Sequence, residues 1–324
     1  MQATAVAHPN IALIKYWGTS NIDRNIPAVG SLSITLDGLT TTTTVSFNSD
    51  LDEDEFLLGG QAIPEMSGRV SRCLDLVRER GGAQTRARVE SNNDFPTAAG
   101  LASSASGFAA LVAAANAAMG VTIPQNELAD MARRSSGSAA RSLYGGFVEL
   151  RLTPDGPYPT ETRQILEPSD WPLRVAVAVT DAGPKEIGST EGMVRTERTS
   201  PYYAGWVNSS EDDLAEVRSA IARRDFVALA EVSESSCLKM HAVMLSARPG
   251  LVYWNGATVE CIRKVRKLRA DGVPVFFTVD AGPQVKAVCA PEAFDRVVAE
   301  FAEVEGVLQV LASGLGEGAR VVES

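Results

Sequence analysis

The sequence predicts an α+β protein built in two lobes. Helical and strand-like segments alternate along the chain, and strand-like segments crowd its first fifty residues. The Pro-rich stretch 154–172 interrupts this pattern near the middle, where composition favours a domain boundary. At 324 residues the chain is long enough for two domains with a sizeable core. We therefore expect domains over residues 1–170 and 171–324.

Alternation of apolar and polar residues indicates the N-terminal strands. Residues 31–36 alternate with a period of two, and residues 40–47 are rich in Thr and Val, as a half-buried strand prefers. Residues 68–80 carry apolar side chains at helical spacing and end at Gly81 and Gly82. The other elements expected in this half are strands at 3–7, 11–18, 86–91 and 147–152, and helices at 108–119 and 125–134.

The second half opens with a buried strand at 173–180, because these residues form one apolar run. A continuous apolar strand at 273–279 ends in Asp280 and a Gly-Pro turn. No repeat of twenty to fifty residues stands out, which argues against a repeat architecture. The remaining predicted elements are helices at 211–224, 227–240, 258–270 and 292–304, and a last strand at 307–312.

Composition limits the classes of function. The chain has 45% hydrophobic and 22% charged residues, typical of a globular protein. Forty acidic residues against thirty basic ones give a net charge of −10, which disfavours nucleic-acid binding. No apolar run reaches the ~20 residues needed to span a bilayer, and no secretory signal is evident. The four cysteines lie far apart, which suits neither a zinc site nor a disulfide framework. We expect a cytoplasmic protein that binds neither membranes nor nucleic acid.

Small residues fill the loop at 96–107, and an alanine-rich helical stretch follows it. A loop of this composition lets backbone N–H groups approach a ligand, and the free N–H groups of a following helix favour a phosphate. A flexible turn before a buried helix accounts for the same residues equally well. The spacing matches neither G-x-x-x-x-G-K-[ST] nor G-x-G-x-x-G, so the common nucleotide fingerprints are absent.

Other polar residues lie at strand ends and in Ser/Gly-rich loops, where catalytic and ligand-binding residues are often found. Asp280 closes an apolar strand, which is typical of a catalytic carboxylate and also of a residue that caps a turn. Arg141 lies in a Ser/Gly cluster, where it could bind a carboxylate or phosphate, or pair with an interior acid. Lys185 precedes a Gly-Ser-Thr segment that offers hydroxyl donors or a helix cap. Two histidines are too few for a metal cluster.

Five motifs occur in one order along the chain: NIALIKYWG at 10–18, NDFPTAAGLASSASG at 93–107, SGSAARSLYGGF at 136–147, GSTEGM at 188–193 and DAGP at 280–283. Together they resemble the diphosphomevalonate decarboxylases, a branch of the GHMP kinase superfamily. The likeness is specific to this branch, because other GHMP kinases share mainly the central loop. The resemblance implies a two-lobed GHMP kinase-like fold, with a ribosomal protein S5 domain 2-like N-terminal domain and a ferredoxin-like C-terminal domain. It also implies a homodimer that uses ATP and Mg²⁺.

The resemblance gives roles to particular residues. It implies that Asp280 works on the C3 hydroxyl of a mevalonate phosphate while the γ-phosphate of ATP arrives, and that Arg141 binds the substrate carboxylate or aligns it against Asp280. Loss of the new C3 phosphate would then drive loss of CO₂. By the same resemblance Ser189 joins the catalytic set, and no protein residue is assigned to a metal. The substrate-binding residues would be Lys15, Tyr16, Thr19, Arg69, Ser136, Ser138 and Lys185. The ATP-binding residues would be Asn93, Gly100, Ala102, Ser103, Ser104 and Ser106.

Thr19 departs from the family pattern, in which a lysine follows the Lys-Tyr-Trp-Gly segment. One cation fewer should weaken binding of a diphosphate more than of a monophosphate, by about 1.5–3 kcal/mol for one charge-assisted contact. We therefore predict decarboxylation of 5-phosphomevalonate, with the same reaction on 5-diphosphomevalonate as the alternative. Arg24 or Lys185 could replace the missing charge. A mevalonate 3-kinase and a non-catalytic nucleotide-binding protein are the remaining hypotheses.

Overall fold

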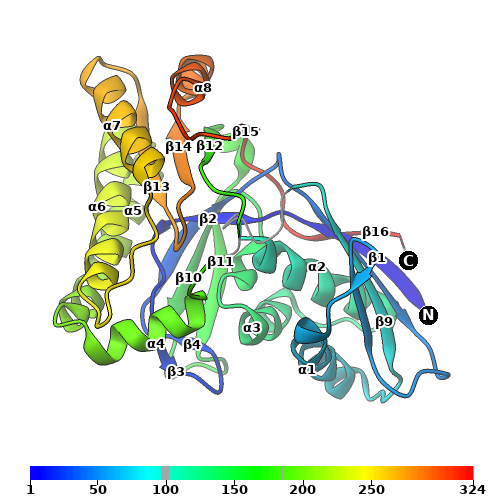
Figure 1. Ribbon diagram of the computed structural model, residues 1–324. Helices are drawn as coiled ribbons and strands as arrows, with labels where there is room; N and C mark the ends of the chain where they lie inside the picture. The colour runs from blue at the N-terminus through cyan, green and yellow to red at the C-terminus, as the bar shows by residue number, and fades with distance from the viewer. Residues whose placement is uncertain (96–101, 184, 324) are drawn as a thin grey trace.

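The N-terminal lobe contains two sheets with helices packed between them (Figure 1). The computed structural model describes residues 1–95, 102–183 and 185–323. The larger sheet has the order β16-β1-β6-β9-β7-β8 and the smaller one β11-β10-β5-β2. The strands of the larger sheet are β1 (Gln2–Ala7), β6 (Thr41–Phe47), β7 (Glu55–Leu58), β8 (Gln61–Ala62), β9 (Ala87–Asn93) and β16 (Arg320–Glu323). Those of the smaller sheet are β2 (Asn10–Ile14), β5 (Ser31–Thr35), β10 (Phe147–Leu152) and β11 (Thr160–Leu166).

Helix α2 (Ser103–Ala118) lies at the centre of this lobe, against β1, β6 and the 3₁₀ helix η1 (Ala139–Leu143). Its many alanines let the backbone approach the sheet closely on one side and η1 on the other. The Thr/Val pattern of β6 is confirmed, since its residues alternate between buried and half-buried. Helices α1 (Pro64–Gly81) and α3 (Gln125–Ser135) complete the layer. A small hairpin of β3 (Thr19–Asn21) and β4 (Ile26–Pro27) projects from the lobe.

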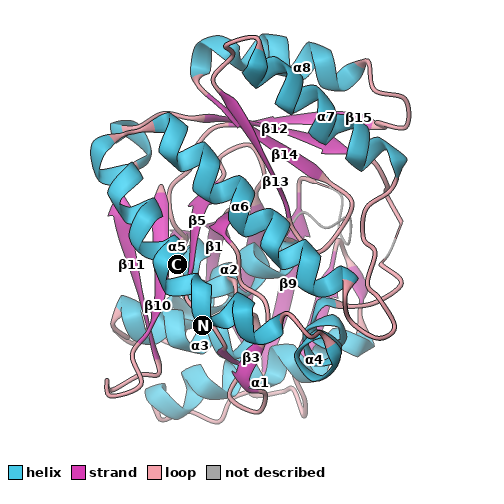
Figure 2. Cartoon of the chain, turned by 90° about the vertical axis from the view of Figure 1, so that its left-hand side faces the viewer, coloured by secondary structure: helices cyan, strands magenta, loops and turns pink. Residues whose placement is uncertain are grey.

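The C-terminal lobe is one antiparallel sheet with helices on both faces (Figure 2). Its strand order is β13-β14-β12-β15. Adjacent residues of β13 face opposite sides, so Phe276 enters the core beneath α5 and α6 and Phe277 enters the core beneath α7 and α8. The strands are β12 (Arg174–Val179), β13 (Val275–Val279), β14 (Val285–Cys289) and β15 (Gln309–Ser313). The helices are α4 (Ser189–Thr199), α5 (Tyr203–Arg223), α6 (Phe226–Leu245), α7 (Gly256–Ala270) and α8 (Phe294–Ala302), with short 3₁₀ helices at Pro168–Asp170 and Pro291–Ala293.

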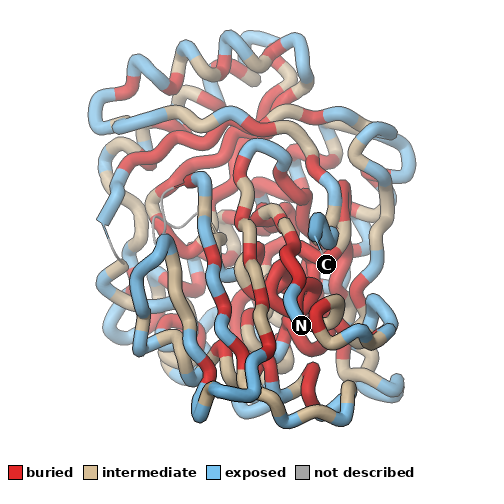
Figure 3. The backbone as a smooth tube through the Cα atoms, turned by 90° about the vertical axis from the view of Figure 1, so that its right-hand side faces the viewer, coloured by how far each residue is buried: buried red, intermediate tan, exposed pale blue. Residues whose placement is uncertain are grey.

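The two lobes share a hydrophobic core. Leu13 and Leu32 of the N-terminal lobe pack in one buried cluster with Val175, Leu214 and Phe276 of the C-terminal lobe. Figure 3 shows the buried backbone running through the middle of the molecule from one lobe into the other. The last strand, β16, returns to pair antiparallel with β1, so the two termini lie close together. The shared core fixes the spacing between the lobes and hence of any site between them. The division at residue 170 stays a prediction.

The α+β class in two lobes is confirmed, but several elements were missed or misplaced. Strand β11 lies inside the stretch expected to be a boundary, because its sequence TETRQIL is that of a polar edge strand. Strand β14 was missed because Lys286 interrupts its short apolar run. Strands β7, β8 and β16 are short and half-buried or exposed, so their sequences show little alternation of apolar and polar residues. Helix α4 was not expected, and α2 and α5 begin earlier than expected, at Ser103 and Tyr203. None of the described helices is long and apolar enough to cross a bilayer.

Candidate active site

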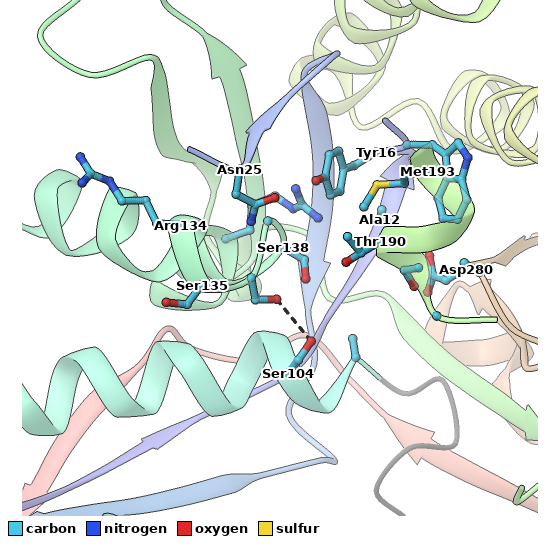
Figure 4. Close-up of a pocket in the computed structure, with 18 of the residues that line it drawn as sticks. Ala12, Tyr16, Asn25, Ser104, Arg134, Ser135, Ser138, Thr190, Met193 and Asp280 are labelled. Carbon is cyan, nitrogen blue, oxygen red and sulfur yellow. Dashed lines mark hydrogen bonds between the residues drawn. The ribbon is translucent and has the colours of Figure 1, made fainter. Parts of the chain in front are cut away.

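A cavity of about 720 Å³ opens between the lobes (Figure 4). The N-terminal lobe contributes the end of β2, one face of α1, the start of α2 and the loop from α3 to η1; the C-terminal lobe contributes the start of α4 and the turn after β13. In a chain of net charge −10 the wall is strongly cationic. Two carboxylates, Asp23 and Asp280, face six cations, Lys15, Arg69, Arg72, Arg134, Arg141 and Lys185. This charge balance suits an anionic ligand.

Asp280 lies in this wall at the end of β13, where two lysines bind its carboxylate. Lys15 Nζ donates to Asp280 Oδ1 at 2.6 Å, and Lys286 Nζ lies 3.0 Å from Oδ2. The lysine side chains are 1% and 3% exposed, whereas that of Asp280 is 30% exposed. Burial would raise the pKa of Asp280, but the charges of Lys15 and Lys286 outweigh burial and hold it well below its usual range. Asp280 is therefore an ionised carboxylate that reaches the cavity.

Arg141, on η1, is a buried cation held by neutral groups. Its Nε donates to Ser33 Oγ at 3.0 Å, its Nη1 to Ser31 Oγ at 2.5 Å and its Nη2 to Asn10 Oδ1 at 3.3 Å. Burial lowers the pKa of Arg141 to about 10, and Tyr16 and Asp280 act in the opposite direction. The alternative of an interior ion pair is not seen, since no ion pair of Arg141 occurs among the described residues. A buried guanidinium without a counter-charge is suited to an anionic ligand.

Tyr16 and the loop between α3 and η1 form a third part of the wall. Ser136 and Ser138 flank Gly137, and all three line the cavity together with Tyr16. The Tyr16 hydroxyl is buried and has no hydrogen-bond partner among the described residues. Burial raises the pKa of Tyr16 to about 12, so the hydroxyl stays a donor at neutral pH. An unpartnered buried donor beside two serine hydroxyls could bind a ligand oxygen.

Gly137→Ala is expected to impair this part of the wall. A Cβ at Gly137 would lie 2.7 Å from Cε1 and from Oη of Tyr16, so the ring would have to move. We expect a loss of about 1–3 kcal/mol in unfolding free energy, typical of overpacking, and a raised KM for the substrate. Chemical denaturation and steady-state kinetics check both. The control is Gly205→Ala in α5, where a Cβ meets nothing within 4 Å; that variant should be as stable as the wild type or more so. An unchanged KM in Gly137→Ala would contradict the placement of Tyr16 at the substrate.

Lys185 and Ser189 lie on the opposite side of the cavity, where Ser189 and Thr190 form the first turn of α4. Free N–H groups and the positive end of the helix dipole at this turn favour negative charge. Burial lowers the pKa of Lys185, the charge of Lys286 adds to this effect, and Asp280 opposes it. Thr190, Asp280 and Ser104 all line the cavity, as Figure 4 shows.

The start of α2 connects this cavity to a second one of about 310 Å³. Ala102 precedes α2 with a left-handed backbone (φ 58°), and no side chain caps the helix. Ser104 and Arg69 line both cavities, and Ser104 Oγ lies 3.3 Å from Ser136 Oγ. Apolar side chains dominate the second wall: Phe56, Leu58, Ile63, Met66, Val70, Val89, Phe108 and Leu111, with Asn93, Ser91 and Thr43 as polar members.

Arg69 is fixed at the junction of the two cavities. Its Nε donates to the Ser135 carbonyl oxygen at 2.7 Å, and its guanidinium lies 4.7 Å from the centroid of the Phe108 ring. Burial lowers the pKa of Arg69, and the nearby charge of Arg72 acts in the same direction. A group that extends from the apolar cavity into the cationic one would therefore pass Arg69 and the start of α2.

The structure brings most of the predicted site residues together. Around the larger cavity lie Lys15, Tyr16, Arg69, Ala102, Ser104, Ser136, Ser138, Arg141, Lys185, Ser189 and Asp280. Asn93 and Ser103 line the second cavity. Thr19 is buried in β3 opposite Pro27, and Ser106 is hydrogen-bonded to Thr41 inside the lobe; neither lines either of these two cavities. Residues 96–101 of the loop, which include Gly100, lie outside the described residues.

Sequence reasoning missed Lys286, Arg72 and Arg134. A signal for Lys286 was available, because a lone lysine inside the apolar run VKAVC is a buried charge that needs a partner. Arg72 lies three residues after Arg69 on α1, so both arginines share one helix face. Nothing local in the sequence indicated that Arg134 would reach the cavity.

Two family models match the chain. The diphosphomevalonate decarboxylase-like N-terminal domain matches residues 7–157. The mevalonate 5-diphosphate decarboxylase C-terminal domain matches residues 175–311. The two matches lie in the two lobes, one in each.

Known proteins resemble the chain over nearly its whole length. The human diphosphomevalonate decarboxylase is 37% identical in an alignment 320 positions long that covers 92% of this chain and 78% of the relative. The phosphomevalonate decarboxylase of Haloferax volcanii is 34% identical in an alignment 327 positions long that covers 100% of this chain and 98% of the relative. A solved structure described as MDDEF in complex with MVAPP, AMPPCP and magnesium superposes with a TM-score of 0.92 at 38% identity, covering 100% of this chain and 99% of the other. These matches confirm the GHMP kinase-like fold. The chain belongs to the diphosphomevalonate and phosphomevalonate decarboxylase family of ATP-dependent carboxy-lyases.

Proposed function

We propose that the protein catalyses the ATP-dependent decarboxylation of (R)-5-phosphomevalonate to isopentenyl phosphate, ADP, phosphate and CO₂. The observation that carries the reaction type is that Arg141 and Asp280 line the same cavity. Arg141 is a buried cation without a counter-charge, and Asp280 is an ionised carboxylate held by two lysines. A 3-hydroxy acid offers one group to each of them, a carboxylate to Arg141 and a hydroxyl to Asp280.

The nucleotide would lie across both cavities. The apolar second cavity suits a nucleoside, and the start of α2 with Arg69 at the junction suits the triphosphate. The solved relative that binds AMPPCP and magnesium supports ATP and Mg²⁺ as cofactors. Among the described residues no group of three or more His, Cys, Asp or Glu could hold a metal. Mg²⁺ would be held mainly by phosphate oxygens and water, and the Ser104 hydroxyl could serve as a protein ligand. When bound, Mg²⁺ would neutralise charge on the phosphates.

The phosphorylated end of the substrate would lie against Tyr16, Ser136 and Ser138, whose hydroxyls can donate to phosphate oxygens. Lys15, Lys185 and the first turn of α4, which contains Ser189, would face the γ-phosphate during transfer. The excess of cations over carboxylates in the cavity wall also favours an anionic substrate over a neutral one.

The reaction balances as two steps. The C3 hydroxyl oxygen attacks the γ-phosphorus, the bond from that phosphorus to the β-phosphate bridging oxygen breaks, and ADP leaves. The hydroxyl proton passes to a phosphate oxygen or to solvent while Asp280 accepts its hydrogen bond. Because Asp280 has a low pKa, it is suited to orient the hydroxyl, and a loose phosphoryl transfer needs little prior deprotonation. In the second step the C3–O bond breaks with release of phosphate, and the electrons of the C1–C2 bond form the C2=C3 double bond as CO₂ leaves.

The resemblance places a lysine where this chain has Thr19, a neutral residue that follows the Tyr16 to Gly18 turn, and this supports the monophosphate as substrate although the Thr19 side chain lines neither cavity. We expect kcat/KM for 5-phosphomevalonate to exceed that for 5-diphosphomevalonate by about tenfold or more. Thr19→Lys should raise kcat/KM for the diphosphate about ten- to a hundredfold and change the monophosphate value less. Coupled ADP release and CO₂ release with both substrates measure this. Asn21→Lys is the matched control, since it adds the same charge at an exposed position of the same strand.

Faster turnover of the diphosphate by the wild type would instead favour the second candidate, 5-diphosphomevalonate, which the human relative's name supports. ADP release with phosphorylated product and no CO₂ would indicate a 3-kinase, and ATP binding without turnover would indicate a non-catalytic protein. The predicted homodimer is checked by light scattering.

A further inference from the structure

Lys286 is a buried cation that the proposed chemistry does not use directly. It lies on β14 opposite Thr278 of β13 and Val177 of β12, and its side chain is 3% exposed. It is not among the residues that line the 720 Å³ cavity. Its ammonium nitrogen lies 3.0 Å from Oδ2 of Asp280. Asp280 and Lys286 belong to one hairpin, joined by the turn at Gly282 and Pro283.

The two oxygens of Asp280 are bound by different lobes. Lys15 comes from the end of β2 in the N-terminal lobe and binds Oδ1, whereas Lys286 comes from the same sheet as Asp280 and binds Oδ2. A carboxylate bound at one oxygen alone can rotate about its Cβ–Cγ bond, and binding at both oxygens fixes that torsion. The pair Asp280–Lys286 is therefore a unit that keeps its geometry within the C-terminal lobe and presents one oxygen to the other lobe.

We propose that Lys286 is a positioning residue that binds Oδ2 of Asp280 and so fixes the carboxylate toward Lys15 and the cavity. This inference rests on the proposed function, since it assigns Asp280 to the reacting hydroxyl. Lys286 contacts Asp280 and does not line the cavity, whereas Lys15 and Lys185 line it themselves.

The charged and titratable groups around Asp280 determine whether its pKa rises or falls when Lys286 is removed. Burial raises its pKa, whereas the charges of Lys15 and Lys286 and their hydrogen bonds lower it. Arg141 of η1 and Lys185, before α4, add positive charge at longer range. From α6, His241 is held neutral, because burial lowers its pKa to about 3, and burial raises the pKa of the Cys237 thiol. Without Lys286, burial opposes fewer cations and the pKa of Asp280 rises.

The test is the pH dependence of kcat in Lys286→Met between pH 5 and pH 9. A protonated Asp280 no longer forms an ion pair with Lys15 and accepts the hydroxyl hydrogen bond more weakly than the carboxylate does. We expect the variant to lose a larger fraction of kcat at pH 5 than at pH 8, relative to the wild type, because the pKa of Asp280 rises when Lys286 is removed. Lys286→Arg should restore the wild-type profile, because it keeps the charge. The control is Lys239→Met, which removes a lysine paired with Asp213 outside the cavity and should leave the profile unchanged.

A second readout does not depend on turnover. In protein labelled with ¹³C at the aspartate carboxyls, with Asp280→Asn to assign the signal, wild-type Asp280 should not titrate down to pH 4. In Lys286→Met its titration midpoint should move above pH 4, and Lys286→Gln serves if the Met variant does not fold. An Asp280 signal and a kcat profile that both match the wild type would overturn the proposal. If the wild type turns over neither substrate, the proposed function fails, and the carboxyl titration still decides whether Lys286 controls Asp280.

Discussion

Asp280→Asn is expected to lower kcat about a thousandfold, because the charged acceptor that orients the C3 hydroxyl for attack is lost. The amide keeps the size of the carboxylate but removes its charge, so it accepts the C3 hydroxyl hydrogen bond weakly. It also leaves Lys15 and Lys286, both nearly fully buried, without a counter-charge. The measurement is ADP release at saturating ATP and phosphomevalonate.

Calorimetry separates a loss of chemistry from a loss of binding. ATP is expected to bind Asp280→Asn with an affinity close to that of the wild type, because the second cavity and the start of α2 do not include Asp280. Asp213→Asn is the matched control: it also neutralises an aspartate paired with a lysine, Lys239, but outside the cavity. Full ADP release by Asp280→Asn would show that the carboxylate is misassigned.

Arg141→Gln is expected to lower kcat/KM for phosphomevalonate by about 10²–10⁴-fold. Two charge-assisted hydrogen bonds to the substrate carboxylate, at about 1.5–3 kcal/mol each, account for a loss of this size. Arg141→Lys should fall between the wild type and Arg141→Gln, because lysine keeps the charge but not the planar fork. The KM for ATP should change little. Steady-state kinetics with each substrate varied in turn measures all three values.

Loss of Arg141 also leaves buried groups without their partner, since Ser31, Ser33 and Asn10 all accept hydrogen bonds from the guanidinium. Thermal unfolding shows whether Arg141→Gln remains folded at the assay temperature. Arg163→Gln is the control, because it removes an arginine paired with Glu149 outside the cavity while Arg218 still pairs with that glutamate. A raised KM for ATP with an unchanged KM for phosphomevalonate would place Arg141 at the nucleotide instead.

Sequence pattern was most informative where each residue's environment repeats at a fixed period. The alternation in β6 and the apolar run in β13 both predicted strands that the structure contains. Pattern failed at β11 and β16, because an edge strand exposes polar side chains and resembles a loop. It also failed at β14, where a functional charge interrupts the apolar run.

By itself the sequence determined the α+β class, the ordered motifs of the family and the small-residue loop at 96–107. These are local properties, because periodicity, composition and spacing can be read directly from the order of residues along the chain. That loop was ambiguous alone, and its first six residues lie outside the described structure, but residues 103–107 form the start of α2, which lies where the two cavities meet.

Only the tertiary structure decided which charges meet. Lys15 and Asp280 are 265 residues apart in the chain, yet their side chains form one ion pair across the lobes. Arg141 could have paired with an interior acid, and the fold surrounds it with hydroxyl groups and an amide instead. The physical reason is that the strength of an interaction between charges depends on distance and burial, and both are set by the packing of the lobes around their shared core.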